Sequence, residues 1–273
     1  MKVKRLDDTA FETIVDCFLS SFEHYYVKVP TDKSYYRTRW AMAKVDFALS
    51  YGMFDGEDLV GFIIHAIDYR NGQKIAHNTG TGVIPSYRGQ RIVRSIYEFA
   101  LPDLKQNGIE KCLLEVIVEN SKAIKSYQSV GFEIRKTLNC FSGEIKLDLK
   151  EEFDLKAVDY ADFDWECLPN QDMYSWDFNN RVIKDGAYNY YQIIKDNQVE
   201  SYFVINPENK ILAQSEILIR REGAWDRLFM GVKKISSNVR IINVDSRLVE
   251  KINLIKSLGL VNTVNQYEMK KTI

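Results

Sequence analysis

Residues 78–93, with the sequence NTGTGVIPSYRGQRIV, have the composition of an anion-binding turn. Two glycines interrupt an apolar run that predicts a strand, and a glycine there commonly marks a bulge or the close approach of another backbone or a ligand. Pro85 cannot donate to a strand ladder, so we expect the strand to end and a helix to begin, with its first amides unpaired. Such amides bind phosphate, and Arg88 or Arg91 adds a charge-assisted hydrogen bond. The segment therefore predicts a site for a phosphate-bearing cofactor.

Two common nucleotide-binding patterns do not fit this segment. The chain has no G-x-x-x-x-G-K-[ST] loop, and Pro85 stands where a dinucleotide fingerprint would have glycine. The predicted cofactor is therefore neither a nucleoside triphosphate on a P-loop nor a dinucleotide on a Rossmann turn.

The overall charge of the chain argues against large anionic partners. Its 273 residues carry 37 basic and 38 acidic side chains, a net charge of -1, so no global field gathers nucleic acid or an anionic membrane. No apolar stretch is long enough for a membrane span or a signal peptide. We therefore expect a cytoplasmic protein with small-molecule partners. Scattered cysteines predict neither a metal site nor disulfides, and they are expected to be reduced and mostly buried: Cys17, Cys112, Cys140 and Cys167.

The order of predicted elements indicates an α/β fold of the α+β type. A short strand is followed by helices, then by an antiparallel meander with Asp55-Gly56 and Asn71-Gly72 at its turns. A helix with Pro102 near its end, a strand, a capped helix and further strands complete the first half. The scheme of residues 112–141 recurs at 239–271, so we expect one fold used twice, with domains at 1–149 and 150–273.

Two motifs in this order resemble the GNAT superfamily of acetyltransferases. Its central signature, Val-x-Pro-x-x-Arg-Gly-x-Gly-x-Gly/Ala, is matched by Val83 to Val93, and its second pattern, Asn-x-x-Ala-x-x-x-Tyr-x-x-x-Gly-Phe, is matched from Asn120 to Phe132. The resemblance covers residues 1–149 and, more weakly, 151–273. It implies two GNAT-like domains, each with a mixed, mainly antiparallel, splayed sheet flanked by helices.

The resemblance implies acetyl-coenzyme A as the acyl donor, bound in a V-shaped opening between the fourth and fifth strands. The last glycine positions of the loop are replaced by Arg91 and Val93, which we expect to weaken the geometry without abolishing binding. The second half lacks the Arg-Gly-x-Gly loop and is expected not to bind the cofactor. The implied cofactor-binding residues are Val83, Arg88, Gly89, Gln90, Arg91, Ile92, Val93 and Asn120.

Two side chains are candidates for proton transfer. An amine must lose a proton before it attacks, and the imidazole of His77, on the strand that enters the glycine segment, is mostly neutral near pH 7 and can accept that proton; a packed histidine is an equal alternative. His65 and Asp68 are substitutes. Tyr127 holds the family position of the acid that protonates the leaving thiolate, or it packs its helix on the sheet.

The expected activity is transfer of acetyl to a primary amine of a small molecule, without a metal. The aromatic residues of the loop 22–40 and the carboxylates Glu23 and Asp32 are candidates for acceptor contact. A non-catalytic acyl-coenzyme A sensor or scaffold is an alternative, as is aminoacyl transfer from charged tRNA, although the neutral charge argues against tRNA. The sequence leaves the acceptor and a homodimer open.

Overall fold

The computed structural model describes residues 1–23, 25–148 and 150–273, which form two compact units. Unit 1 consists of Met1–Arg135 and Tyr267–Ile273, and unit 2 consists of Lys136–Gln266. The boundary expected at residue 149 lies outside the described residues. The units divide the chain differently, because the last seven residues return to unit 1 instead of ending in unit 2.

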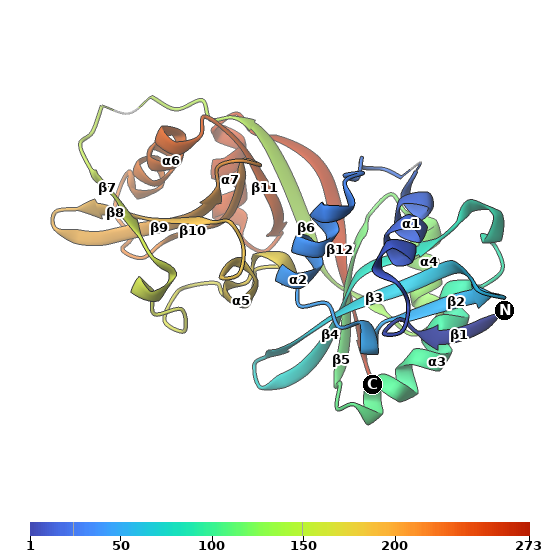
Figure 1. The fold of residues 1–273 in the computed structure, drawn as a ribbon. Helices are drawn as coiled ribbons and strands as arrows, with labels where there is room; N and C mark the ends of the chain where they lie inside the picture. The colour runs from blue at the N-terminus through green and yellow to red at the C-terminus, as the bar shows by residue number, and fades with distance from the viewer. Residues whose placement is uncertain (24, 149) are drawn as a thin grey trace. The chain divides into compact units, whose positions relative to one another are not determined.

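Unit 1 is a sheet with helices on both faces (Figure 1). Its strands lie in the order β1-β2-β3-β4-β5-β12, with β1 to β4 antiparallel and β5 parallel to β4. The elements are β1 (Lys2–Arg5), α1 (Phe11–Phe22), α2 (Lys33–Met42), β2 (Tyr51–Asp55), β3 (Asp58–Arg70), β4 (Gln73–Val83), α3 (Ile92–Gln106), β5 (Lys111–Ile117) and α4 (Ser121–Ser129).

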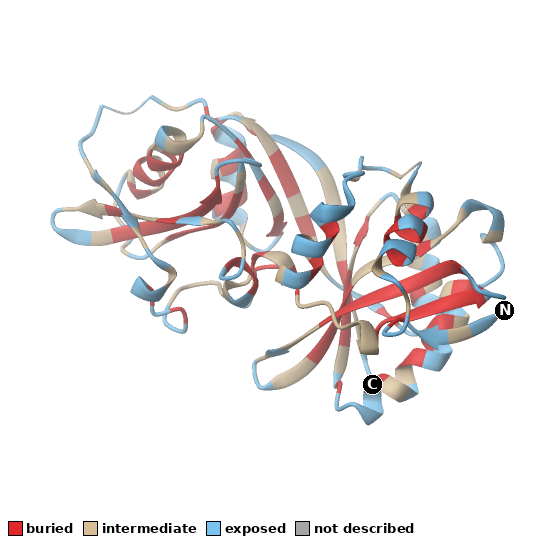
Figure 2. Cartoon of the chain, viewed as in Figure 1, coloured by how far each residue is buried: buried red, intermediate tan, exposed pale blue. Residues whose placement is uncertain are grey.

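The two helices that precede β2 cover one face of the unit 1 sheet, and the two helices that follow β4 cover the other face. The apolar side of α1 packs with α2 on one face, where Phe18 contacts the rings of Trp40 and Phe62. On the other face α3 and α4 bury Tyr97 and Tyr127. Figure 2 shows the buried residues on the central strands and the inner sides of the helices. The apolar residues that recur at helical spacing in the sequence therefore form the packing faces of these helices.

Unit 2 repeats the same arrangement of a sheet with helices (Figure 1). Its strands lie in the order β12-β6-β11-β10-β9-β8-β7. The elements are β6 (Glu133–Glu144), β7 (Asp154–Val158), α5 (Asn180–Ile183), β8 (Asn189–Lys195), β9 (Gln198–Asn206), β10 (Ile211–Ile217), α6 (Ala224–Ile235), β11 (Asn238–Asp245), α7 (Val249–Ser257) and β12 (Val261–Thr272). The fold class predicted from the sequence is confirmed.

The last strand, β12, begins in unit 2 and ends in unit 1 along the chain. Its end belongs to unit 1, where it follows β5 and where Met269 is fully buried in the core. The amide of Ile273 donates to the carbonyl of Glu110. Unit 1 therefore completes its core only when the far end of the chain has folded onto it.

Three local expectations differ from the structure. The helix expected from Arg88 begins at Ile92, because residues 88–91 form a loop with two residues at positive φ. The two strands expected after Gly131 are one strand, β6. Cys17, Cys112 and Cys140 are buried as expected, whereas Cys167 is exposed. None of the helices in the described part of the chain has both the length and the apolar character needed to cross a bilayer.

Candidate functional site

The strands β4 and β5 separate in the middle of unit 1. Their parallel pairing runs from Ile75 with Lys111 to Asn78 with Leu114. Beyond this point β4 continues to Val83 and β5 to Ile117 with no further pairing between them among the described residues. The backbone edges of both strands are therefore open at the place where the sequence resemblance implies a splayed sheet.

A bulge in β4 marks the start of the separation. The register with β3 shifts at Thr79, because Ile64 pairs with Gly80 and His65 with Asn78. The glycines that follow make room for α1. A Cβ at Gly82 would lie 2.6 Å from the Ser21 Cβ and the Phe62 ring, and one at Gly80 would lie 3.2 Å from Phe18. Gly82 is thus required by the close approach of neighbouring side chains, whereas a side chain at Gly80 would need a small shift of Phe18.

The loop between β4 and α3 presents the amides predicted from the sequence. Gly89 and Arg91 both have positive φ, +81° and 58°. Arg91 is the N-cap of α3, and the first intrahelical bond runs from the Ser95 amide to the Arg91 carbonyl. The amides of the first turn, from Ile92 onward, have no acceptor within the helix and point out of its N-terminus. This geometry suits an anion.

Arg88 has a structural role in the loop. Its guanidinium donates to the carbonyl of Ser21 at 2.9 Å and to the carbonyl of Val83 at 3.2 Å. These bonds join the end of β4 to the end of α1. Arg88 therefore holds the loop in place. The Arg91 side chain forms no such hydrogen bond to a backbone carbonyl of the described residues.

A cavity of about 770 Å³ lies at this point of unit 1. The ends of α1 and β4 form one wall, and the loop before α3 and the first two turns of α4 form the other. Four of its side chains are basic, and its described lining contains no carboxylate and no imidazole. Such a lining attracts a polyanion. The lining residues are Ser21, Phe22, Tyr25, Tyr26, Thr81, Gly82, Val83, Tyr87, Arg88, Gly89, Arg91, Ile92, Val93, Asn120, Lys122, Ala123, Lys125, Ser126 and Tyr127.

Tyr127 lies at the inner end of this cavity and is almost fully buried. Burial raises the pKa of Tyr127 to about 12, and hydrogen bonds with Thr81 and Asn78 oppose this rise. The phenol is therefore a neutral hydrogen-bond donor at every physiological pH. Asn120 lines the cavity and also caps α4, where its side chain accepts from the Ala123 amide at 3.2 Å, so both of its expected roles are compatible.

His77 and Gln90 are not among the described residues that line the cavity. His77 is 4% exposed, and it precedes Asn78, whose side chain bonds to Tyr97 of α3. Because successive residues of a strand point to opposite faces, His77 points away from α3. His77 therefore does not share the face on which Asn78 contacts α3. Gln90 is exposed on the loop.

The other candidates for proton transfer and acceptor contact have structural partners. The His65 ring is fully buried, and Asp68 forms a 2.7 Å ion pair with Lys44. Asp32 caps α2. Of the loop aromatics, Tyr25 and Tyr26 line the cavity, whereas Tyr36 and Trp40 pack against α1.

The sequence profile described as the acetyltransferase (GNAT) family matches residues 11–132. Residues 11–132 belong to the GNAT acetyltransferase family. The matched segment contains both strands of the opening, the loop before α3, and α4 with Tyr127. A comparison with curated protein sequences finds no significant match.

Solved structures share the fold of the GNAT segment and of the rest of the chain. A tandem GNAT protein from the clavulanic acid biosynthesis pathway is 10% identical, with a TM-score of 0.68 over 99% of this chain and 98% of its own. A GCN5-related N-acetyltransferase from Sphaerobacter thermophilus is 8% identical, with a TM-score of 0.65 over 99% of this chain and 95% of its own. At these identities the likeness establishes the fold alone.

Within the GNAT segment, several residues that line the cavity are not specified by either sequence motif. Thr81 lies between the two glycines that dominate the pattern, and its hydroxyl becomes relevant only because the bulge turns it toward Tyr127. Lys122 and Lys125 are spaced by three residues on α4, a helical spacing that could have indicated one basic face. Among the described residues, no group of three or more His, Cys, Asp or Glu side chains could hold a metal ion.

Proposed function

We propose that unit 1 transfers an acetyl group from acetyl-coenzyme A to a primary amine of a small molecule. The observation that carries this proposal is the cavity at the end of β4, beyond the point where β4 and β5 stop pairing, which is lined by the first residues of α3 and by Tyr127. The diphosphate fits the amides from Gly89 to Val93 and the charges of Arg91, Lys122 and Lys125. The thioester arm then reaches along the open edge of β4 toward Tyr127.

Tyr127 is proposed to stabilise the leaving thiolate. The reference pKa of a thiol is about 8.5, whereas burial raises the pKa of Tyr127 to about 12. Complete proton transfer from the phenol is therefore uphill by roughly 3.5 units, or about 5 kcal/mol. Tyr127 acts mainly as a hydrogen-bond donor, whose bond strengthens as negative charge develops on sulfur, and the thiolate takes its proton from solvent.

The amine is proposed to enter the cavity already deprotonated. Its described lining offers no carboxylate or imidazole as a base, and its basic side chains disfavour a cationic ammonium. The rate should therefore follow the neutral fraction of the acceptor in solution. His77 remains a candidate base only through a path of water molecules, and a His77→Gln variant with an unchanged pH profile of kcat/KM removes it.

The test is release of thiol from acetyl-coenzyme A across a panel of primary amines. We expect turnover with at least one amine, a fall in kcat of about 10- to 100-fold for Tyr127→Phe, and unchanged cofactor binding by calorimetry. Tyr69→Phe, at an exposed position near the end of β3, is the matched control. Tight coenzyme A binding without turnover would establish a sensor instead, and no binding would refute the site.

A further inference from the structure

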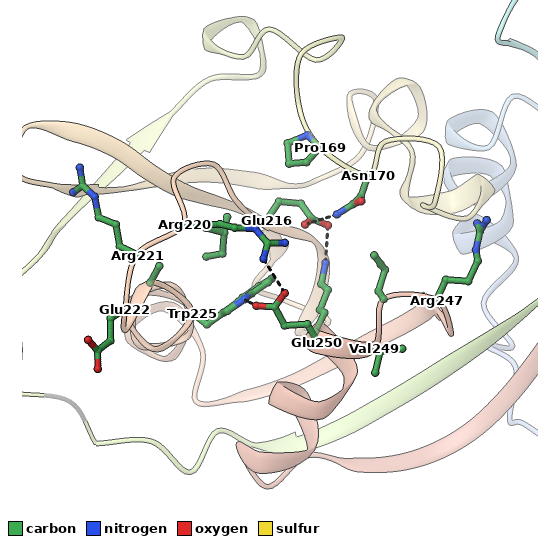
Figure 3. A pocket seen from close by; sticks show the side chains of 14 residues that line it. Pro169, Asn170, Glu216, Arg220, Arg221, Glu222, Trp225, Arg247, Val249 and Glu250 are labelled. Atoms are coloured by element: carbon green, nitrogen blue, oxygen red, sulfur yellow. Dashed lines mark hydrogen bonds and ion pairs between the residues drawn. The ribbon is translucent and has the colours of Figure 1, made fainter.

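A second cavity, of about 650 Å³, lies in unit 2 where β10 and β11 end and where α6 and α7 begin (Figure 3). In the described part of the chain, β10 pairs with β11 only at Ile211 and Arg240, so these strands also separate. The register of β10 shifts at Ala213, as that of β4 does at Thr79. This cavity therefore has the same place in unit 2 as the proposed cofactor cavity has in unit 1.

A buried ion pair lies in the wall of this cavity. Glu216 is the third residue after the bulge, the position that Gly82 has in β4. Its carboxylate lies 3.0 Å from the Lys251 ammonium, and both side chains are at most 5% exposed. Lys251 also donates to the Ser215 carbonyl at 2.6 Å. A charged side chain thus stands where unit 1 has a glycine, and the lining of this cavity differs from that of the unit 1 cavity.

The charges on the cavity wall are mixed, unlike those of the unit 1 cavity. The lining contains three carboxylates, Glu216, Glu222 and Glu250, and four cations, Arg220, Arg221, Arg247 and Lys251. Three of these cations have close partners: Arg221 pairs with Asp196 at 3.2 Å, Arg247 with Asp245 at 2.6 Å, and Lys251 with Glu216.

The fourth cation, Arg220, pairs only loosely with Glu250. Their charged atoms are 3.4 Å apart, and the side chains are 87% and 60% exposed. An ion pair so exposed contributes little, because water screens both charges. Figure 3 shows Arg220 and Glu250 facing each other beside Trp225, whereas Arg221 and Glu222 point away from them. The pair is thus available for exchange with a ligand.

The neighbours of this pair define the chemistry of the ligand. Trp225 donates from its indole nitrogen to Glu250 at 3.2 Å, and Trp225, Leu248 and Val249 supply the apolar part of the wall. A purely anionic ligand can pair only with Arg220, and a purely cationic ligand can pair only with Glu250. A ligand with both charges and an apolar group satisfies each of these residues.

We propose that unit 2 binds a zwitterionic α-amino acid with an apolar or aromatic side chain. The carboxylate pairs with Arg220, the ammonium pairs with Glu250, and the side chain lies against Trp225. Asn170, which donates to Glu216 at 2.9 Å, forms the opposite wall. The site is independent of the activity proposed for unit 1.

Calorimetry on the whole protein tests the charge requirement with three probes that share one ring. L-phenylalanine carries both charges, phenethylamine only the ammonium, and 3-phenylpropionate only the carboxylate. We expect L-phenylalanine to bind at least about tenfold more tightly than either of the others, since each lacks one charge-assisted bond. The proposal is overturned if 3-phenylpropionate or phenethylamine binds as tightly as L-phenylalanine. It is also overturned if neither L-phenylalanine nor L-leucine, a second apolar amino acid, binds.

Substitutions at two exposed residues locate the site without destabilising the fold. Arg220→Ala should remove the advantage of L-phenylalanine over phenethylamine, and Glu250→Gln should remove its advantage over 3-phenylpropionate. Arg240→Ala and Glu208→Gln, which are exposed and outside the cavity, are the matched controls. Binding that survives both cavity substitutions places the ligand elsewhere and overturns the assignment. Saturating coenzyme A should leave all these affinities unchanged.

Discussion

The carboxamide of Asn78 donates a 2.6 Å hydrogen bond to the Thr81 hydroxyl across the bulge in β4. The same nitrogen donates to the Tyr97 hydroxyl at 2.8 Å, and the Asn78 oxygen accepts from the Gly80 amide at 3.1 Å. One buried side chain therefore fixes the shape of the bulge, anchors it to α3, and places Thr81 beside Tyr127.

Asn78→Ala should weaken both stability and the proposed catalysis. It leaves buried polar partners without hydrogen bonds, and each unpaired group costs about 1–3 kcal/mol. We expect the free energy of unfolding in urea to fall by about 2–4 kcal/mol, and kcat to fall more than the affinity for coenzyme A changes. Thr81→Val removes one partner alone and should have a smaller effect on stability. A variant with wild-type stability would show that the bulge does not depend on Asn78.

Arg91 occupies a backbone conformation that favours glycine, with φ 58° and ψ 24°. A non-glycine residue pays roughly 1–2 kcal/mol there, while glycine adds entropy to the unfolded chain. Arg91→Gly should therefore keep the free energy of unfolding within about 1 kcal/mol of the wild type. Arg91→Val should lower it, because a β-branched side chain fits this region least.

Arg91→Gly also tests whether the charge of the Arg91 side chain contributes to cofactor binding. Arg91→Gly should bind coenzyme A less tightly and with a weaker dependence on ionic strength, since one charge near the proposed diphosphate is gone. Calorimetry at low and high salt measures both quantities. An unchanged salt dependence would mean that the Arg91 side chain does not approach the cofactor.

His65 should make the protein sensitive to mild acid. Burial lowers the pKa of His65 to about 4, with its hydrogen bond to the Leu49 carbonyl opposing the shift. The unfolded chain has the ordinary value near 6.5, so it binds the proton more readily than the folded state, and stability is lost as pH falls from about 6.5 toward 4. The expected loss between about pH 7 and pH 4.5 is 2–3 kcal/mol.

Urea unfolding at several pH values measures this loss. His65→Asn can keep the donor to Leu49 without the titration, so the difference between variant and wild type isolates the histidine from other acidic groups such as Asp103. Identical pH dependence in the two proteins would contradict the assignment. The His65 Nε2 atom is buried and has no hydrogen-bond partner among the described residues, which agrees with a neutral ring.

Arg227 should be essential to the folding of unit 2. Its guanidinium joins α6 to β9 by hydrogen bonds of 2.8 and 2.7 Å to the fully buried Glu200, and it pairs with Glu151 at 2.6 Å. Arg227→Met leaves a buried carboxylate uncompensated, which costs about 3–5 kcal/mol. Arg240→Met is the exposed control. Adding Glu200→Leu to Arg227→Met should restore part of the stability, and a simple sum of the two effects would show that the residues are not coupled.

Much of the local structure followed from the sequence. The Asn71-Gly72 turn, the cap of α4 by Asn120 and the apolar faces of α1 and α3 depend on neighbours close in the chain, so propensity and periodicity predict them. The loop motif likewise placed the amides before α3, since Pro85 restricts the backbone and Gly89 permits the positive φ of the loop.

The roles of individual side chains were less predictable. Arg88, a candidate for anion binding, also donates to two carbonyls, one of them on Ser21, 67 residues earlier in the chain. His77 was expected in the site, but the face on which a strand residue lies depends on the register and on the bulge at Thr79. Such contacts depend on residues that no local pattern connects.

The sequence by itself determined the order of the elements, the GNAT motif and the family of residues 11–132. Only the tertiary structure decided that the end of β12 completes unit 1, that Asn78 joins the bulge to α3, and that Glu216 and Lys251 form a buried ion pair in the wall of the second cavity. The physical reason is the range of the interactions. Turns, caps and helical faces are fixed by residues a few positions apart, whereas strand pairing and buried ion pairs join segments that meet only in the folded chain.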